Sequence, residues 1–475
     1  MAQARPGGLI GALDNASLNR FHLRAVLVSG MGFFTDAYDL FIIGIASTLI
    51  KQDWHLDTSH LAILNATMLG AAFLGAMCFG RIADLVGRKR VYWLVAAVMA
   101  VASIGSALSP SFWVLIAFRF LLGLGVGGDY PVSAVLMTEY ANRKDRGRLV
   151  GLVFSTQALG LIIGPLIALA FLGAGISTGL TWRLLLALGA VPAGAVVYLR
   201  SRMPESPRFQ VQVQGKQVTA RQELTRFTDG VVTSDAASEA GPQRRIGLRE
   251  FLTTRRFLVL LSGTAGCWFL LDYAYYGNTI STPQIIALIS PSATTMDTIA
   301  IQLAIFVVAA VPGYILGIAR IDRIGHRKLQ LGGFIMMAVC FGVIALVPGM
   351  TTAVLPFLIA YGISYFFTEF GPNMTTFVLP GEVFPVSTRA TGHGISAGIG
   401  KFGAFVGVFL FPVLSDHLGL QHTLLLAGII SAAGAALTLV LPEPSGRSLE
   451  EISAAEPAAV REVAGSGQQS PVSGA

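Results

Sequence analysis

Residues 80–90 read GRIADLVGRKR, and residues 319–328 read ARIDRIGHRK. Each stretch directly follows a long apolar run. Aligning Asp84 with Asp322 also aligns the glycine three positions further on and the basic residues after it. A loop pattern that returns in this way indicates that the chain is built from two equivalent halves.

A second pair of motifs supports the repeat. Glu139 and Arg146 stand seven residues apart in EYANRKDRG, and Glu382 and Arg389 stand seven residues apart in EVFPVSTRA. Each of these motifs also follows an apolar run. The pattern predicts a parallel repeat about an axis along the membrane normal, with a substrate site near the bilayer midplane between the halves.

Composition places the chain in a membrane. Of the 475 residues, 53% are hydrophobic and 12% are charged, whereas soluble domains carry about 25% charged residues. The apolar residues gather in runs of about 20, the length that crosses a bilayer as a helix. The alternating strands of about 10 residues that build a membrane β-barrel are not evident. The sequence therefore predicts an all-α polytopic membrane protein with twelve transmembrane helices in two six-helix bundles, near residues 24–50, 60–82, 91–109, 113–138, 149–174, 182–200, 257–281, 297–320, 329–348, 353–377, 391–414 and 420–441.

The longest polar stretch divides the chain between the two bundles. It is rich in Gln, Thr, Ser and Asp before a basic segment, a composition that favours a partly disordered linker ending in a short amphipathic helix. We expect an N-terminal bundle at residues 1–203, a cytoplasmic linker at 204–256, a C-terminal bundle at 257–441 and a disordered cytoplasmic tail at 442–475.

The net charge of +7 is interpreted as a topology signal and not as a nucleic-acid surface. Arg and Lys crowd alternate loops, such as residues 88–90 and 143–148, whereas the turn at residues 109–111 carries no charge. We expect the protein in the plasma membrane. By the positive-inside rule, both termini and the linker are expected on its cytoplasmic side. The three cysteines all lie in apolar runs, so no disulfide framework is expected.

Ionisable side chains inside the predicted spans are the candidates for function. A charge at the bilayer centre costs about 2.5–3.5 kcal/mol, so each is expected to face the protein interior for a reason. The alternative for each residue is a buried ion pair that only fixes the helix register. The residues are Asp36, Asp39, Arg119, Asp129, Asp272 and Lys401.

The strongest local pattern lies in CWFLLDYAYYG. Trp268, Asp272 and Tyr276 are spaced i, i+4 and i+8, which puts them on one face of a helix. An acid flanked by two neutral hydrogen-bond donors is suited to holding an oxyanion. The alternative for Trp268 is an aromatic side chain packed against a neighbouring helix.

Several motifs resemble the major facilitator superfamily: the D-x-x-G-R-K loop and its copy, RFLLGLGVGG, PESPRF and PEPSGRSLEEI. Five longer blocks are similar to the phosphate:proton symporters of fungi and plants, over about residues 10–450. These blocks are MGFFTDAYDLF, GVGGDYPVSAVLMTEYANRKDRG, CWFLLDYAYYG, FGPNMTTF and HGISAGIGKFGA.

This resemblance implies three groups of residues. The substrate site would comprise Tyr130, Gln157, Trp268, Asp272, Tyr276, Asn373 and Lys401. Proton coupling would use Asp36, Asp39, Asp129, Arg119 and Asp272, with Arg119 stabilising one carboxylate while another titrates and with Asp39 open to a structural role. A charged latch that gates the cytoplasmic opening would comprise Asp84, Arg88, Glu139, Arg146, Asp322, Glu382 and Arg389.

The expected partners are inorganic phosphate and protons, with no cofactor. A phosphate in a low-dielectric cavity needs donors on several sides, and Lys401 supplies a single point charge. Ionised Asp272 would repel phosphate, whereas protonated Asp272 would donate a hydrogen bond to it, so each ligand favours binding of the other. Proton loss in the cytoplasm would then expel the substrate.

Other functions fit the sequence less well. No nucleophile–base constellation supports an enzyme, and the seven histidines show no metal-ligand spacing. GLGVGG lacks a preceding strand, so close helix contact explains it better than a nucleotide site. A symporter for a sugar or organic acid and a non-transporting phosphate sensor remain alternatives, and the oligomeric state is open.

Glu369 departs from the family, in which an amide or a small polar residue is usual near that point. A carboxylate facing the cavity would oppose an anion and alter the proton stoichiometry. A shielded structural role is the alternative.

Overall fold

A computed structural model describes residues 8–228, 230 and 246–454. The first half contains α1 (Gly8–Asp14), α2 (Arg20–Trp54), α3 (Thr58–Val86), α4 (Arg88–Ala107), α5 (Phe112–Tyr140), α6 (Arg146–Ser155), α7 (Gln157–Gly173), α8 (Thr178–Leu188) and α9 (Ala190–Ser201). The connection contains α10 (Pro207–Gln212), α11 (Gln217–Phe227) and α12 (Leu248–Thr253). The second half contains α13 (Arg255–Ile280), α14 (Thr282–Ile289), α15 (Thr295–Ile305), the π-helix η1 (Phe306–Ala310), α16 (Val311–Ile324), α17 (His326–Leu346), α18 (Val354–Phe370), α19 (Pro372–Val383), α20 (Arg389–Thr438) and α21 (Leu449–Ala454).

The described residues contain eleven helical segments long and apolar enough to cross a membrane. The last of them, α20, has 50 residues, more than twice the length that a bilayer needs. Non-helical dihedral angles at Gly419 (φ 79°, ψ 159°) divide it into two spans. The chain therefore crosses the membrane twelve times, as an all-α protein, and the predicted fold is confirmed.

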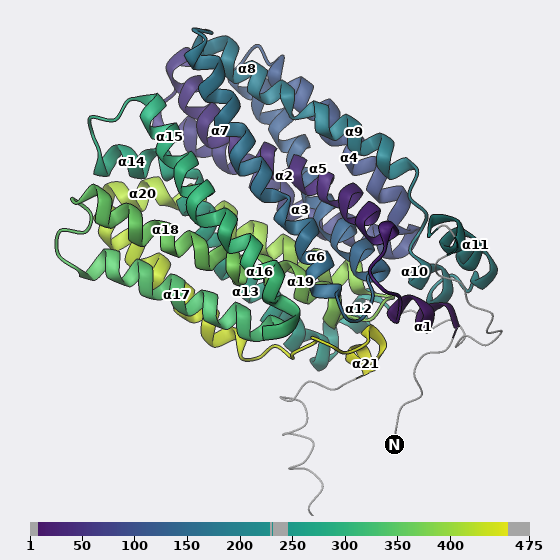
Figure 1. The fold of residues 1–475 in the computed structure, drawn as a ribbon. Helices are drawn as coiled ribbons and strands as arrows, with labels where there is room; N and C mark the ends of the chain where they lie inside the picture. Colours follow the sequence, from purple (N-terminus) through teal and green to yellow (C-terminus); the bar gives the residue numbers. More distant parts are fainter. Residues whose placement is uncertain (1–7, 229, 231–245, 455–475) are drawn as a thin grey trace, which may run out of the picture.

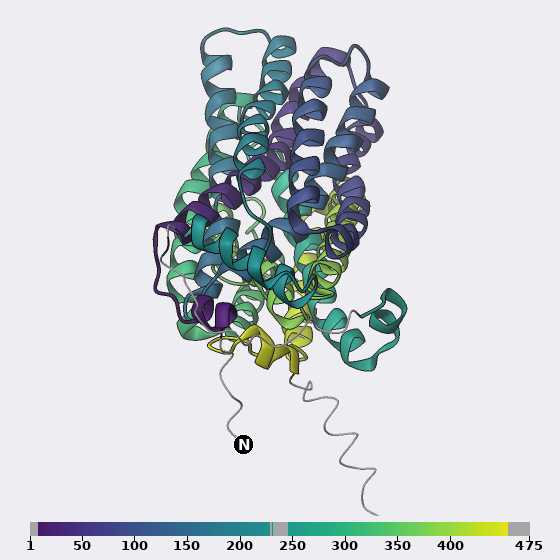
Figure 2. The same cartoon turned by 90° about the vertical axis from the view of Figure 1, so that its right-hand side faces the viewer.

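The two halves lie side by side (Figure 1), one drawn in purple to blue and the other in green to yellow. Helices α1, α10, α12 and α21 gather at one end of the bundles, which we call the terminal face (Figures 1 and 2). The connections of α7 to α8 and of α14 to α15 lie at the other end, the opposite face (Figure 1).

Small residues set the spacing between the helices inside each half. A Cβ atom added at Gly127 of α5 would collide with the carbonyl of Ala72 in α3, and one at Gly75 of α3 would collide with the carbonyl of Leu124. Close contact between helices in lipid depends on such residues, because no side chain then separates the backbones. GLGVGG is therefore a helix-packing motif in this protein.

The repeated loops have the same backbone conformation. Gly87, between α3 and α4, has φ 107° and ψ 153°, and Gly325, between α16 and α17, has φ 96° and ψ 144°. A residue with a Cβ rarely adopts a positive φ of this size, which explains why a glycine stands at both positions. The sequence repeat is thus a structural repeat.

Helix α12 lies where the sequence predicts a short helix at the end of the linker, whereas the sequence did not indicate that α10, α11 and the start of the predicted disordered tail are folded. Arg208 of α10 is fully buried, and its guanidinium contacts Asp14 of α1 and, at 2.5 Å, Glu450 of α21. Because these partners come from three distant segments, the polar composition of each segment alone gave no sign of the cluster. Residues 231–245 and 455–475 lie outside the described residues.

Candidate functional site

The centre of the molecule holds a lysine and an aspartate from the second half. Lys401 of α20 donates from Nζ to Asp272 Oδ2 of α13 at 2.9 Å and to the Tyr276 hydroxyl at 3.0 Å. All three side chains are at most 1% exposed. A buried pair of this kind is stable only when geometry and further hydrogen bonds offset the loss of hydration.

Tyr130 of α5 completes this group from the first half. Its hydroxyl lies 3.4 Å from the Tyr276 hydroxyl, and the ammonium of Lys401 lies over both rings, 4.5 Å and 4.2 Å from their centroids. A cation over two aromatic faces is held electrostatically as well as by its hydrogen bonds. We call Tyr130, Trp268, Asp272, Tyr276 and Lys401 the central cluster.

Trp268 lies one turn before Asp272, and its indole N–H faces the Asp272 carboxylate. Its ring packs 6.2 Å from Tyr130 and 6.3 Å from Phe377, between ring centroids. The predicted face of α13 therefore turns toward Lys401, and Trp268 serves both as a donor and as a packing residue.

Asn373 and Gln157, the two remaining predicted substrate residues, form no hydrogen bond with the central cluster among the described residues. Asn373 of α19 donates from Nδ2 to Glu369 Oε2 at 2.5 Å and to the Tyr314 hydroxyl at 3.1 Å. Gln157 begins α7, is 1% exposed, and neither polar atom of its amide has a hydrogen-bond partner among the described residues. A buried amide without partners is costly, so Gln157 is free to receive one.

Aromatic layers close the cluster on both sides. On the side of the terminal face, Phe33, Phe154 and Phe377 pack together, with ring centroids 4.6 Å apart for Phe33–Phe377 and 4.8 Å apart for Phe154–Phe377. On the side of the opposite face, Phe41 stacks on Tyr276 at 5.4 Å. The cluster is therefore shielded from both surfaces of the membrane protein.

A cavity of about 260 Å³ lies beyond Phe41, toward the opposite face. It runs between α2 and α3 of one half and the ends of α13, α14 and α15 of the other. Its polar lining includes Ser47, Thr48, Lys51, Asn65 and Gln284. Apolar side chains such as Ile45, Leu61 and Ile280 form much of the remaining wall, and Lys51 is the one charged residue that the described part of the chain contributes to the lining.

The buried acids of the first half lie beside two arginines. Asp129 pairs with Arg200 of α9 at 2.5 Å, and Arg119 donates to the backbone carbonyl of Asp39 at 2.9 Å. Asp36 lies beside Asp129, and the two carboxyl groups face each other. Arg119 is the cation next to Asp39, and Arg200 is the cation next to Asp129.

Arg200 is the functional candidate that the sequence reasoning missed. It stands in YLRSRMPES, where it reads as one more basic residue at the end of a span. In the structure it is fully buried, and its guanidinium also lies 3.7 Å from the centroid of the Tyr92 ring. No signal in the sequence separates it from Arg202, because only the packing of α9 against α4 turns it inward.

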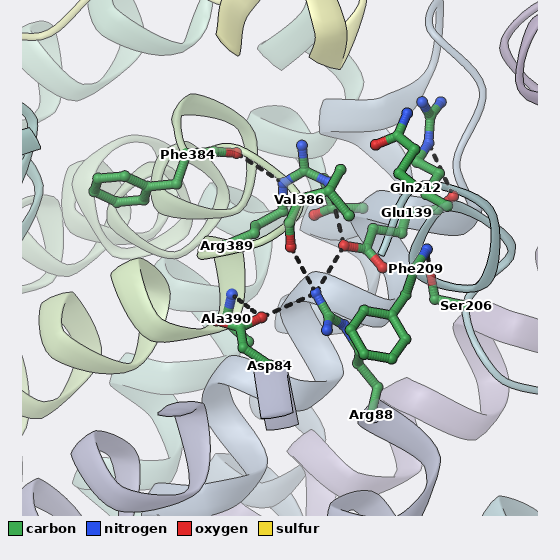
Figure 3. A network of polar contacts seen from close by, with 12 residues as sticks. Asp84, Arg88, Glu139, Ser206, Phe209, Gln212, Phe384, Val386, Arg389 and Ala390 are labelled. Atoms are coloured by element: carbon green, nitrogen blue, oxygen red, sulfur yellow. Dashed lines mark hydrogen bonds and ion pairs between the residues drawn. The ribbon is translucent and has the colours of Figure 1, made fainter. Parts of the chain in front are cut away.

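Figure 3 shows the first part of the predicted latch at the terminal face. Arg88 contacts Asp84 at 3.0 Å and Glu139 at 3.3 Å, and it donates to the carbonyl of Val386 in the second half at 3.0 Å. Arg389, also from the second half, contacts Glu139 at 3.2 Å. Asp84 accepts from the backbone N–H of Thr391 at 2.6 Å, so a carboxylate caps the start of α20 across the interface.

The second part of the latch mirrors the first. Asp322 of the second half accepts from the backbone N–H groups of Gly147 and Arg148, at the start of α6 in the first half, at 3.1 and 2.8 Å. Arg146 contacts Glu382 at 3.0 Å. All seven predicted latch residues therefore join the two halves or support residues that do.

Two further carboxylates belong to this arrangement. Glu205 accepts from the backbone N–H groups of Arg88 and Lys89, at 3.1 and 3.2 Å, and Glu443 accepts from those of His326 and Arg327, at 3.0 Å each. Glu205 of PESPRF and Glu443 of PEPSGRS are separated by the same number of residues as Asp84 and Asp322. The sequence repeat alone would therefore have identified these two glutamates as equivalent residues.

Their environments differ. Burial raises the pKa of Glu205, against the opposing effect of its backbone hydrogen bonds. Burial also disfavours ionisation of Glu443, but the hydrogen bond and charge of His326 outweigh it and lower the pKa. The two halves of the latch are thus equivalent in geometry and distinct in electrostatics.

The chain is similar to known membrane transporters over most of its length. The family described as sugar (and other) transporter matches residues 25–455. The probable inorganic phosphate transporter 1-6 of Arabidopsis thaliana is 36% identical over 97% of this chain and 99% of that protein. Inorganic phosphate transporter 1-6 of Oryza sativa subsp. japonica is 36% identical over 94% of this chain and 95% of that protein.

Solved structures share the fold. The proton:xylose symporter XylE bound to 6-bromo-6-deoxy-D-glucose superposes with a TM-score of 0.75 at 19% identity, over 91% of this chain and 98% of that chain. A partially occluded inward-open form of XylE from E. coli gives 0.72 at 18% identity, over 90% and 100%. The chain belongs to the sugar (and other) transporter family of the major facilitator superfamily, in the branch of the inorganic phosphate transporters.

Proposed function

We propose that this protein imports inorganic phosphate together with protons, as a secondary active symporter that works by alternating access. The central cluster carries the proposal, because it joins one cation, one acid and three neutral donors at the contact between the halves. The names of the plant relatives support phosphate as the substrate.

The pair of Lys401 and Asp272 supplies the coupling. While Asp272 is ionised, the pair is neutral as a whole, and Lys401 has little net attraction for an anion. A proton on Asp272 frees the charge of Lys401 for phosphate, and the carboxyl group becomes a donor to it. Tyr130, Tyr276 and Trp268 then donate to the remaining phosphate oxygens. Gln157 offers an amide that has no hydrogen-bond partner within the described part of the chain.

Asp36 is the proposed entry of protons into this cluster. It interacts with Asp129 and also faces Tyr130 and Lys401, so it links the acids of the first half with the substrate site. Arg200 stabilises the charge of Asp129 through its ion pair. Because Arg200 pairs with Asp129, Asp36 has no ion-pair partner of its own among the described residues, and we expect the proton on Asp36.

The two halves, residues 1–203 and 257–441, are the proposed moving units. The latch holds them together at the terminal face, and the cavity of about 260 Å³ lies toward the opposite face. The loops at the terminal face carry many positive charges, so we assign this face to the cytoplasmic side of the plasma membrane. Loading from outside would therefore precede opening of the latch.

Uptake of radioactive phosphate into liposomes that contain the purified protein tests the function. We expect uptake that depends on an inward proton gradient and that an uncoupler abolishes. Unlabelled xylose and sulfate serve as competitors. Gradient-independent uptake, or uptake of a sugar without uptake of phosphate, would refute the proposal, and phosphate binding without uptake would indicate a sensor.

A further inference from the structure

A second carboxyl group lies beside the central cluster, and the proposed mechanism does not use it. Glu369, near the end of α18, is 0% exposed. Its Cβ packs against Gly313 of α16, where the absence of a side chain allows the two helices to approach closely. The surrounding protein therefore holds Glu369 deep between the helices of the second half.

The groups that face Glu369 are all neutral donors or phenols. Asn373 of α19 donates to Oε2 at 2.5 Å, and the hydroxyls of Tyr275 from α13 and Tyr314 from α16 face the carboxyl group. Tyr365 is the titratable neighbour on α18 itself. Among the described residues no basic side chain forms an ion pair with Glu369, in contrast to Asp272 and Asp129.

Two polar atoms of this group lack partners. Glu369 Oε1 and the hydroxyl of Tyr275 have no hydrogen-bond partner among the described residues. An unpaired ionised carboxylate in such surroundings loses several kcal/mol of hydration, which a buried carboxyl group avoids by taking up a proton. A proton on Oε1 would remove the charge and let the carboxyl group donate to the Tyr275 hydroxyl.

Glu369 is also connected to the substrate site. Asn373 uses both hydrogens of its amide, one for Glu369 and one for the Tyr314 hydroxyl. The Tyr314 hydroxyl in turn lies in the neighbourhood of the hydroxyls of Tyr130 and Tyr276 of the central cluster. The charge state of Glu369 therefore decides whether the Asn373 amide is bound to a carboxylate or is available to a phosphate.

We propose that Glu369 is a further proton-coupling residue, which binds one proton when phosphate binds and releases it when phosphate leaves. The inference rests on the proposed phosphate symport. An unpaired carboxylate at Glu369 would repel phosphate in the neighbouring site, so phosphate binding requires the proton on Glu369. Departure of that proton restores the bond from Asn373 to the carboxylate and removes a donor from the phosphate.

The test compares the wild-type protein with Glu369→Gln in the same liposomes. The entry of protons, followed with an internal pH indicator, is divided by the entry of radioactive phosphate at a fixed membrane potential. Phosphate itself carries protons in a pH-dependent number, so both proteins are measured at one pH. We expect one proton fewer per phosphate for Glu369→Gln, and a weaker rise of the phosphate KM with pH.

Two further variants sharpen the result. Glu369→Asp retains the carboxyl group and is expected to restore the wild-type proton count, whereas Asp416→Asn changes an exposed acid of the same half and is expected to change nothing. Glutamine resembles the protonated carboxyl group in size and charge, so Glu369→Gln is expected to fold like the wild type. Failure of that variant to fold, or an unchanged proton count and pH dependence, would overturn the inference.

The same measurement separates the two proposals. If the wild-type protein takes up phosphate with protons and Glu369→Gln shows the same ratio, only the role of Glu369 is refuted. If the wild-type protein shows no phosphate uptake, the proposed function fails and the inference fails with it.

Discussion

Replacing Glu139 by glutamine should open the latch. Glu139 is 0% exposed and accepts from Arg88 and Arg389, which belong to different halves, at 3.3 and 3.2 Å. The substitution keeps the volume of the side chain but leaves two buried guanidinium groups without this charge. Removal of one partner from a buried ion pair costs about 3–5 kcal/mol.

The cost falls on the latched state, because separation of the halves returns both arginines to water. A change of about 3 kcal/mol corresponds to a shift of roughly 100-fold in the population of two states. Even a strongly favoured closed latch should then be open in a measurable fraction of molecules. Phosphate uptake should fall, because a carrier that rests open toward the cytoplasm loads poorly from outside.

Spin labels at Lys144→Cys and Lys328→Cys, two exposed positions of the terminal face in different halves, report the opening. Cys78, the exposed native cysteine, is replaced by serine first. Distances measured by double electron–electron resonance should lengthen in Glu139→Gln. The control is Glu223→Gln, because Glu223 contacts Gln210 of the same connecting segment. Identical distance distributions in the wild type and Glu139→Gln would refute the reasoning.

Three further outcomes are expected. Asp272→Asn should abolish gradient-driven phosphate uptake in the liposome assay, and a wild-type rate and pH profile would remove Asp272 from the mechanism. Arg200→Met should lower phosphate uptake at least tenfold because the buried Asp129 loses its ion pair. Arg200→Lys should partly restore uptake, and a wild-type rate in Arg200→Met would contradict the prediction. The positive charge of Arg208 has a larger effect on Glu450 than burial, and it lowers the pKa of Glu450 from 4.5 to about 2. This pair therefore contributes about 3 kcal/mol of stability above pH 4.5, and the contribution is lost as the pH falls toward 2. The melting temperature of Glu450→Gln should therefore lie below that of the wild type at neutral pH, and the difference should shrink in acid. A difference that stays constant with pH would contradict the prediction.

The spans, the repeat and the latch residues were predictable because each leaves a local mark in the chain. Hydrophobic runs of fixed length, glycines at Gly87 and Gly325 and paired charges at a fixed spacing need no knowledge of distant contacts. The face of Trp268, Asp272 and Tyr276 was equally accessible, because helix periodicity alone brings side chains four residues apart together.

Other parts of the site required the third dimension. Arg200 looks like an ordinary basic residue after a span, and only the packing of α9 makes it the partner of Asp129. The ion pair between Arg208 and Glu450 joins segments that are polar and unremarkable when taken separately. Glu369 stands out in the sequence as an acid inside a span, but only its neighbours show that no cation among the described residues pairs with it.

The sequence by itself determined which segments enter the membrane, that they form two equivalent halves and which helix faces carry the acids. These properties follow from hydropathy and from the helical repeat, both of which act along the chain. The tertiary structure decided which charge neutralises which, because the pairing of buried ions depends on distances of a few ångströms between helices far apart in sequence. That pairing distinguishes Asp272 and Asp129, which form ion pairs, from Glu369, which forms none with the residues that the structure describes.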